Sequence, residues 1–239
     1  MKVIFNADDY GLCKGVNLGI VESYENGLVK SATMMANMPG FDHAVSIAPK
    51  GLGIGVHLTL TAGQALGGVY KTITDINGNF LRRPQLEERA NTNQIDLDEI
   101  KKEYTLQIEK IIKTGIKPTH FDGHHHTQNF SGIVDVFISL ANEYNVPVRL
   151  DEKNCNVKTV AFVSTFYGEG ATESHLEEIL SNIKETTEIM CHPAYIDNFL
   201  MESSRYSSPR AVEMDVLTSK RMKDMVLEKG LENICFGDL

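Results

Sequence analysis

Four candidate strands of this sequence each lead into titratable side chains. These are Asp8 and Asp9, His57, the segment Asp122–His126 with its three consecutive histidines, and His192. Carboxylates and imidazoles bind divalent metal ions and transfer protons in enzymes. If the four strands are parallel, their carboxyl ends lie at one edge of a sheet, so residues far apart in sequence converge there. The sequence therefore predicts an active site that contains a metal ion.

Each of these motifs has a simpler explanation when it is taken alone. An Asp-Asp pair after a strand is often a turn or a helix cap. A single His57 is more often a packed residue than a ligand, and His124–His126 could be a surface cluster. Two adjacent carboxylates after a buried run, however, need a cation or strong hydrogen bonds. The occurrence of all these residues at four strand ends favours the metal site.

One carboxylate and two neutral imidazoles would give the metal a mixed set of oxygen and nitrogen ligands. Such a set suits Zn, Mn, Co, Ni or Fe better than Mg, which prefers oxygen. Three protein ligands leave positions for water and substrate, and the cation would acidify that water and polarise a carbonyl oxygen. Adjacent side chains on an extended segment point in opposite directions, so we expect one of Asp8 and Asp9 to be a ligand and the other a base.

The elements that must position these residues alternate between strand and helix patterns. In the clearest helix, apolar residues from Leu97 to Ile111 share one face, Asp96 and Glu99 resemble a capping box, and Gly115 ends the pattern. The expected strands are Val3–Ala7, Val29–Met35, Gly53–Leu60, Thr119–Asp122, Val146–Leu150, Val157–Val163, Glu188–Cys191 and Ile234–Phe236. The expected helices are Lys14–Asn26, Asp42–Ala48, Leu97–Thr114, Ile133–Tyr144, a segment after Ser174 that includes Leu176–Ile183, and Thr218–Lys229. This alternation predicts an α/β fold with parallel strands and helices outside, and both a doubly wound sheet and a barrel satisfy it.

Two stretches, 61–95 and 193–209, interrupt the alternation. Both are long for simple connections, and long ordered loops in compact domains are often functional. Each follows a strand that ends in a histidine, so we expect both at the rim of the active site, with 61–95 as a lid that selects the substrate. The length of 239 residues is compatible with a single domain.

Composition excludes several functional classes. The chain has 23 Lys and Arg against 32 Asp and Glu, a formal charge of −9, without long runs of one sign. This acidity argues against nucleic acid or an anionic membrane as a partner, and it tolerates a neutral or cationic sugar. Cys13, Cys155, Cys191 and Cys235 form no CxxC pair, which is unlike a disulfide framework or a zinc–thiolate site. The sequence reaches Asp8 too early for a signal peptide and has no apolar segment of transmembrane length, so we expect a cytoplasmic protein.

Four ordered motifs resemble those of the YdjC-like carbohydrate deacetylases, a family that includes the chitooligosaccharide deacetylases. They are NADDYG at Asn6–Gly11, GVHLTL at Gly55–Leu60, KPTHFDGHHH at Lys117–His126 and MCHPAYID at Met190–Asp197. The resemblance continues through PR and EMDVLTS in Pro209–Ser219, so it covers nearly the whole chain. It implies a distorted, TIM-like β/α barrel, a single domain over 1–239, removal of acetyl groups from N-acetylated mono- or oligosaccharides, and a homodimer.

The resemblance also assigns roles to matched residues. It implies that Asp9, His57 and His124 hold one divalent ion, that Asp8 is the base acting on water, and that His192 is the acid for the leaving amine. The choice of His124 from the three histidines rests on the resemblance alone. So does Mg as the ion, whereas the donor set favours Zn, Mn, Co or Ni.

Further candidates surround this site. Asp122 and His126 could orient the metal ligands, and His126 could also contact the substrate. Arg149 could stabilise an oxyanion or pair with the base, and it could equally form a structural salt bridge. Tyr167 and Tyr195 could stack on sugar rings, or they could simply pack.

Two other functions compete with deacetylation. A metal-dependent phosphoesterase on a similar barrel would generally need two metals and basic phosphate clamps, and neither a Gly-rich phosphate loop nor a Lys/Arg cluster accompanies these motifs. A non-catalytic sugar-binding protein would need neither Asp8 nor His192. We therefore expect a metal-dependent deacetylase.

Overall fold

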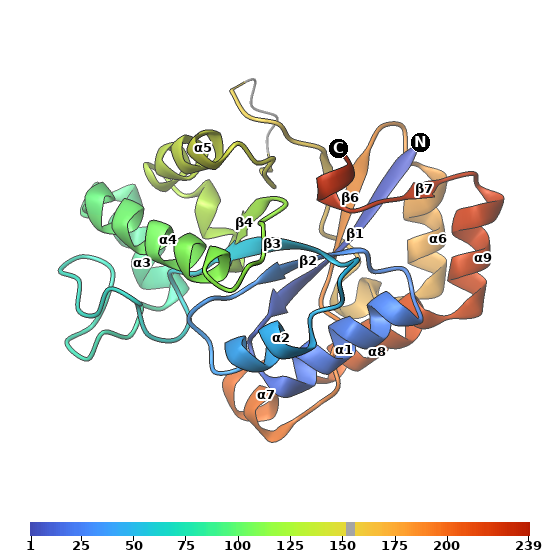
Figure 1. Cartoon of the computed structure of the whole chain (residues 1–239), viewed down its shortest axis with the longest axis horizontal. Helices are drawn as coiled ribbons and strands as arrows, with labels where there is room; N and C mark the ends of the chain where they lie inside the picture. The colour runs from blue at the N-terminus through green and yellow to red at the C-terminus, as the bar shows by residue number, and fades with distance from the viewer. Residues whose placement is uncertain (152–155) are drawn as a thin grey trace. The chain divides into compact units, whose positions relative to one another are not determined.

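The computed structural model describes residues 1–151 and 156–239, so Cys155 lies outside the described residues (Figure 1). Cys13, Cys191 and Cys235 are free thiols. Within the described residues, no helix has the length and apolar character needed to cross a bilayer.

One seven-stranded sheet runs through the described chain. Its strands follow the order β4, β3, β2, β1, β6, β5, and β7 pairs with β1. The strands are β1 Lys2–Tyr10, β2 Ser31–Met34, β3 Gly53–Leu58, β4 Phe121–Gly123, β5 Ala161–Val163, β6 Thr187–Cys191 and β7 Glu232–Asn233. β1 pairs in parallel with β6 and β7, β3 with β4, and β5 with β6. Every residue of β1 after Lys2 is buried, as expected for a parallel strand that is covered on both faces.

Helices alternate with these strands, so the predicted class, an α/β chain with parallel strands in a distorted barrel-like fold, is confirmed. The helices are α1 Lys14–Glu25, α2 Phe41–Ile47, α3 Arg83–Asn91, α4 Leu97–Ile112, α5 Ile133–Tyr144, α6 Glu173–Ser181, α7 Asn198–Ser203, α8 Ser208–Thr218 and α9 Lys220–Glu228. Three short 3-10 helices are η1 His124–Asn129, η2 Gly168–Gly170 and η3 Phe236–Asp238.

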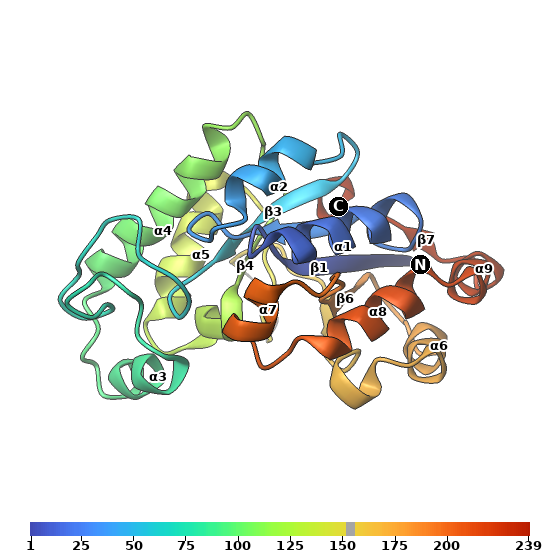
Figure 2. The same cartoon turned by 90° about the horizontal axis from the view of Figure 1, so that it is seen from below.

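The chain divides into two compact units, of which the first comprises residues 1–33, 39–53 and 160–239. Within it, α1 packs on α8, α8 on α9, and α9 on α6 (Figure 2). Apolar residues four apart supply the buried faces: Leu176 and Leu180 in α6, and Met222 and Val226 in α9.

The second unit comprises residues 34–38 and 54–159. Here α4 packs on α5, and its buried face includes Ile100, Tyr104, Ile108 and Ile111. Asp96 caps α4 by accepting a hydrogen bond from the backbone N–H of Asp98. The predicted capping box is only half correct, because Glu99 instead accepts hydrogen bonds from residues 71 and 72.

Several local predictions were wrong. The segment Val146–Leu150 is not a regular strand: only Val148 forms a parallel bridge, with Phe121. The last strand is Glu232–Asn233 instead of Ile234–Phe236. Thr172 rather than Ser174 caps α6, through a hydrogen bond from the N–H of His175.

The two long interruptions contain helices that the sequence analysis did not assign. α3 lies within 61–95, and α7 lies within 193–209. α3 is polar along most of its length, with only Leu86 and Ala90 buried, so it lacks the broad apolar face that predicts a helix.

Candidate active site

Asp8 and Asp9 lie near the carboxyl end of β1, and both are buried. Asp8 Oδ1 accepts a hydrogen bond from Asn6 Nδ2 at 2.9 Å, whereas Asp9 Oδ2 lies 2.6 Å from Nη2 of Arg210. The two carboxylates thus contact different side chains. Asp9 has a φ of 69°, a left-handed conformation that is costly for a residue other than glycine and that clusters at functional sites.

The register between β1 and β6 brings His192 to Asp8. The last residue pair of this ladder is Ala7 with Cys191, and the next residues along the two strands are Asp8 and His192. Nε2 of His192 lies 4.0 Å from Asp8 Oδ2, and both side chains are largely buried. Two residues that the sequence identified at separate strand ends therefore face one another.

Helix α8 contributes two buried charged residues that the sequence analysis did not assign to the site. Arg210 forms the ion pair with Asp9, and Glu213 accepts a hydrogen bond from the backbone N–H of His192. Both lie on the buried face of α8 together with Leu217. Charged residues at the apolar positions of a helix are the signal that could have identified them.

Aromatic rings surround His192. Tyr167 stacks on Tyr206 with ring centroids 3.9 Å apart and planes 8° apart. The edges of both tyrosines approach His192, at centroid distances of 5.5 and 5.6 Å. Burial is the main cause that raises the pKa of Tyr206 and of Tyr167, and the nearby carboxylate of Glu213 adds to the increase for Tyr206. Tyr167 is nevertheless 44% exposed.

In the second unit, the register of β3 with β4 places His57 directly beside Asp122. Nδ1 of His57 lies 2.7 Å from Asp122 Oδ1, and Asp122 Oδ2 lies 3.0 Å from Nη1 of Arg149. All three side chains are buried. Backbone hydrogen bonds between Phe121 and its neighbours Pro147 and Arg149 hold the arginine alongside β4. Arg149 therefore forms a buried salt bridge with Asp122.

The three histidines leave β4 in an unusual conformation. His125 and His126 have φ angles of 57° and 56°, so the chain turns sharply after His124. Nδ1 of His124 lies 3.3 Å from Nε2 of His57, and the two rings meet edge to face. His125 is exposed and contacts Thr61 Oγ1 through Nδ1 at 2.9 Å. Successive histidines therefore have different surroundings: His124 contacts His57, and His125 contacts Thr61.

The stretch that we expected as a lid is held by two carboxylates of α4. Glu103, fully buried, accepts hydrogen bonds from the backbone N–H groups of Leu66 and Gly67, each at 2.9 Å. Glu99 accepts hydrogen bonds from the backbone N–H groups of Lys71 and Thr72, each at 2.8 Å. The first part of 61–95 is thus an ordered loop tied to a helix.

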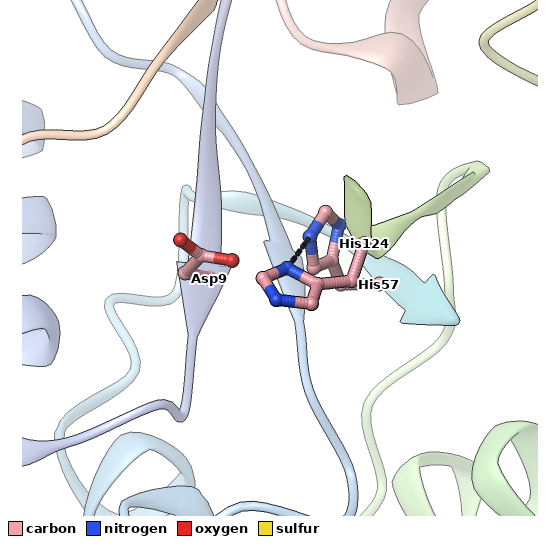
Figure 3. A group of neighbouring side chains, drawn as sticks. All are labelled: Asp9, His57 and His124. Atoms are coloured by element: carbon pink, nitrogen blue, oxygen red, sulfur yellow. Dashed lines mark hydrogen bonds between the residues drawn. The ribbon is translucent and has the colours of Figure 1, made fainter. Parts of the chain in front are cut away.

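Asp9, His57 and His124 each offer one ligand atom for a metal ion, and these atoms lie within 4.8 Å of one another. Figure 3 shows the three side chains, with the contact between His57 and His124 dashed. This group is the set that the sequence analysis selected. One carboxylate and two imidazoles form a donor set for a divalent ion.

The fold and these residues define a parallel α/β protein with a candidate Asp/His metal site, and comparison with known proteins specifies its family. The model of the YdjC-like protein family matches residues 2–228, so the chain belongs to this family. Similar relatives are named carbohydrate deacetylases. The protein of Clostridium beijerinckii is 39% identical with full coverage of both chains, and that of Thermoanaerobacter pseudethanolicus is 40% identical over 96% of this chain and 95% of its own. Carbohydrate deacetylase 1 of Listeria innocua is 40% identical, again with full coverage of both.

Solved structures agree on the fold. A protein of Enterococcus faecalis V583, with a proposed role in cellobiose-phosphate cleavage, has a TM-score of 0.90 at 29% identity and covers 99% of this chain and 98% of its own. The Bc1960 peptidoglycan N-acetylglucosamine deacetylase has a TM-score of 0.57 at 14% identity and covers 98% of this chain and 85% of its own. The second likeness shows a shared fold only.

Proposed function

We propose that this chain is a carbohydrate deacetylase that removes the acetyl group from N-acetylated mono- or oligosaccharides, with one divalent ion held by Asp9, His57 and His124. The observation that carries the proposal is the grouping of these three ligand atoms within 4.8 Å. The full-length relatives named carbohydrate deacetylase supply the reaction and confirm the predicted enzyme class, a hydrolase of amide bonds.

The donor atoms fit a divalent ion. Because Nδ1 of His57 faces the carboxylate of Asp122 at 2.7 Å, the hydrogen of a neutral imidazole belongs on that nitrogen. Nε2 is then free of a hydrogen and can offer its lone pair as a ligand. The mixed set favours Zn, Mn, Co or Ni, and Mg stays a prediction from the family resemblance. When bound, the ion polarises the acetamido carbonyl and acidifies water.

The residues around the ion divide the proton transfers. Asp8 takes a proton from the attacking water, while Asn6 holds its other oxygen in place. His192 donates a proton from Nε2 to the leaving nitrogen, so that the C–N bond breaks and acetate and a free amine are released. The 4.0 Å between His192 Nε2 and Asp8 Oδ2 supports this division, because the two groups lie side by side without a direct hydrogen bond.

Other predicted residues support this reaction. Asp122 and Arg149 orient His57, and His126 contacts the substrate near the turn after β4. The Tyr167 ring, which lies against His192 and is partly exposed, stacks on the sugar, and Tyr195 extends this surface with a ring that is 46% exposed. The chain 1–239 acts as one catalytic domain with 61–95 and 193–209 at its rim. A homodimer in the cytoplasm stays a prediction.

The test is acetate release from N-acetylglucosamine and its oligomers. Protein stripped with a chelator is assayed alone and after addition of Mg, Mn, Co, Ni or Zn. We expect acetate only in the metal-loaded samples. Sugar phosphates belong in the same panel, because the Enterococcus relative has a proposed role with cellobiose-phosphate. Phosphate release without acetate release would overturn the proposal in favour of a phosphoesterase.

A further inference from the structure

Glu213 is a fully buried carboxylate for which the proposed reaction has no use so far. It lies on α8 and faces the segment that follows β6. A buried carboxylate is costly unless hydrogen bonds or a cation compensate its charge. Its surroundings therefore indicate what it does.

The contacts of Glu213 converge on His192. Oε2 accepts a hydrogen bond from the backbone N–H of His192, and Oε1 accepts one from the hydroxyl of Tyr206. Oε1 also lies 3.7 Å from Nδ1 of His192, a buried nitrogen with no hydrogen-bond partner among the described residues, so this contact is electrostatic and is not a hydrogen bond. Among the described residues, this carboxylate pairs with the imidazole of His192.

Tyr206 completes the arrangement from the other side. Its hydroxyl donates to Glu213 and accepts a hydrogen bond from the backbone N–H of Gly168 at 2.7 Å. The Tyr206 ring also contacts His192 edge to face. The carboxylate is thus fixed by a tyrosine that is itself anchored to the main chain.

We infer that Glu213 is a positioning residue for His192, holding its backbone and directing Nδ1 inward so that Nε2 faces Asp8 and the substrate. The inference rests on the proposed function of His192 as the acid. A carboxylate beside one imidazole nitrogen keeps the hydrogen on that nitrogen and orients the ring, which decides which nitrogen does the chemistry. Tyr206 keeps the carboxylate in this position.

Glu213→Gln tests the inference, because the amide oxygen can still accept a hydrogen bond while the charge is lost. We expect kcat for acetate release to fall about 100-fold, the scale of acid catalysis, with KM changed less than about twofold. Nitrogen-15 spectra of labelled histidine should show the Nδ1 signal of His192 shifting as its hydrogen is lost. Glu228→Gln, which changes an exposed glutamate of α9 outside the site, is the matched control and should resemble the wild type.

The outcomes separate the inference from the proposed function. Unchanged kcat and unchanged His192 signals in a folded Glu213→Gln variant would overturn the inference. If Glu213→Gln does not fold, Glu213→Asp provides the test, because the shorter side chain withdraws the carboxylate from Nδ1 of His192. We expect kcat to fall about tenfold with KM retained. A wild-type kcat in this variant would contradict the inference. A wild-type protein that releases no acetate would sink the proposed function, while the nitrogen-15 spectra would still report whether Glu213 sets the hydrogen on Nδ1.

Discussion

Two neighbouring-strand pairs of histidine and aspartate occur in this molecule, one in each compact unit. His57 on β3 lies 2.7 Å from Asp122 on β4, and His192 after β6 lies 4.0 Å from Asp8 on β1. Both arise from parallel register, which places residues of adjacent strands side by side. The same two residue types in the same relation therefore form one tight contact and one open contact.

The two pairs also differ in the charged residue that contacts them from the far side. On the far side of Asp122 from His57 lies Arg149. Its buried Nη1 is 3.0 Å from Asp122 Oδ2, so Arg149 holds the carboxylate that orients His57. Behind His192 lies Glu213, whose carboxylate is 3.7 Å from Nδ1. A metal ligand must keep its geometry, whereas a proton donor needs its second nitrogen open to the substrate. In the proposed reaction, the group behind each pair, which is Arg149 behind Asp122 and Glu213 behind His192, separates the metal ligand from the proton donor.

The largest predicted effects come from substituting one residue of each pair, His57 in the tight pair and Asp8 in the open pair. His57→Ala should lose both metal binding and activity, because it removes a ligand. Asp8→Asn should retain the metal and lose about 10²–10⁴-fold in kcat, because it removes the base only. Metal content after dialysis and acetate release from the same samples check this pair. Near wild-type turnover in Asp8→Asn would refute the base assignment.

A smaller effect is predicted for the support behind the tight pair. Asp122→Asn keeps the shape of the side chain but removes the charge between His57 and Arg149. We expect the metal affinity to fall about 10–100-fold, as for other residues that orient a metal-binding histidine. Metal titration by calorimetry measures it, with Asp135→Asn, an exposed residue of α5, as the control. An affinity equal to that of the control would show that Asp122 does not support the ligand.

The smallest effect concerns the rings around the open pair. Tyr167→Ala should raise KM for N-acetylglucosamine oligomers about 2- to 10-fold, from a stacking free energy of roughly 0.5–1.5 kcal/mol. Tyr195→Ala should have a smaller effect, because the rings that pack on His192 are those of Tyr167 and Tyr206. Steady-state kinetics compares the two variants. A larger increase in KM for Tyr195→Ala than for Tyr167→Ala would indicate that the sugar stacks away from His192.

The strand-end residues could be predicted from the sequence because their positions follow from a simple rule. A buried apolar run predicts a strand, alternation with helices predicts parallel pairing, and the carboxyl ends then share one edge. The family resemblance assigned different roles to His57 and His192, but the contacts that distinguish the two residues could not be predicted, because they depend on register and on side chains from elsewhere in the fold. Arg149 illustrates this, since its partner Asp122 is set by a single bridge between Phe121 and Val148.

Helix α8 shows a different limit. Its Pro209–Ser219 segment contributed to the family resemblance, but hydrophobic periodicity assigns no role to Arg210 or Glu213. Their importance appears only when the helix is packed and both side chains are found buried, against Asp9 and His192. A charged residue on an apolar helix face carries this information in the sequence, although its partner must come from the structure.

At residues 66, 67, 71 and 72, the loop at the start of 61–95 is held through its main chain, while the side chains of Tyr70, Ile73 and Thr74 are buried. Glu99 and Glu103 accept hydrogen bonds from backbone N–H groups, which every amino acid except proline provides. At these four positions the path of the loop does not depend on which side chains it displays. An engineer who keeps the two glutamates and the buried side chains can therefore vary the exposed side chains of this loop without redesigning the scaffold.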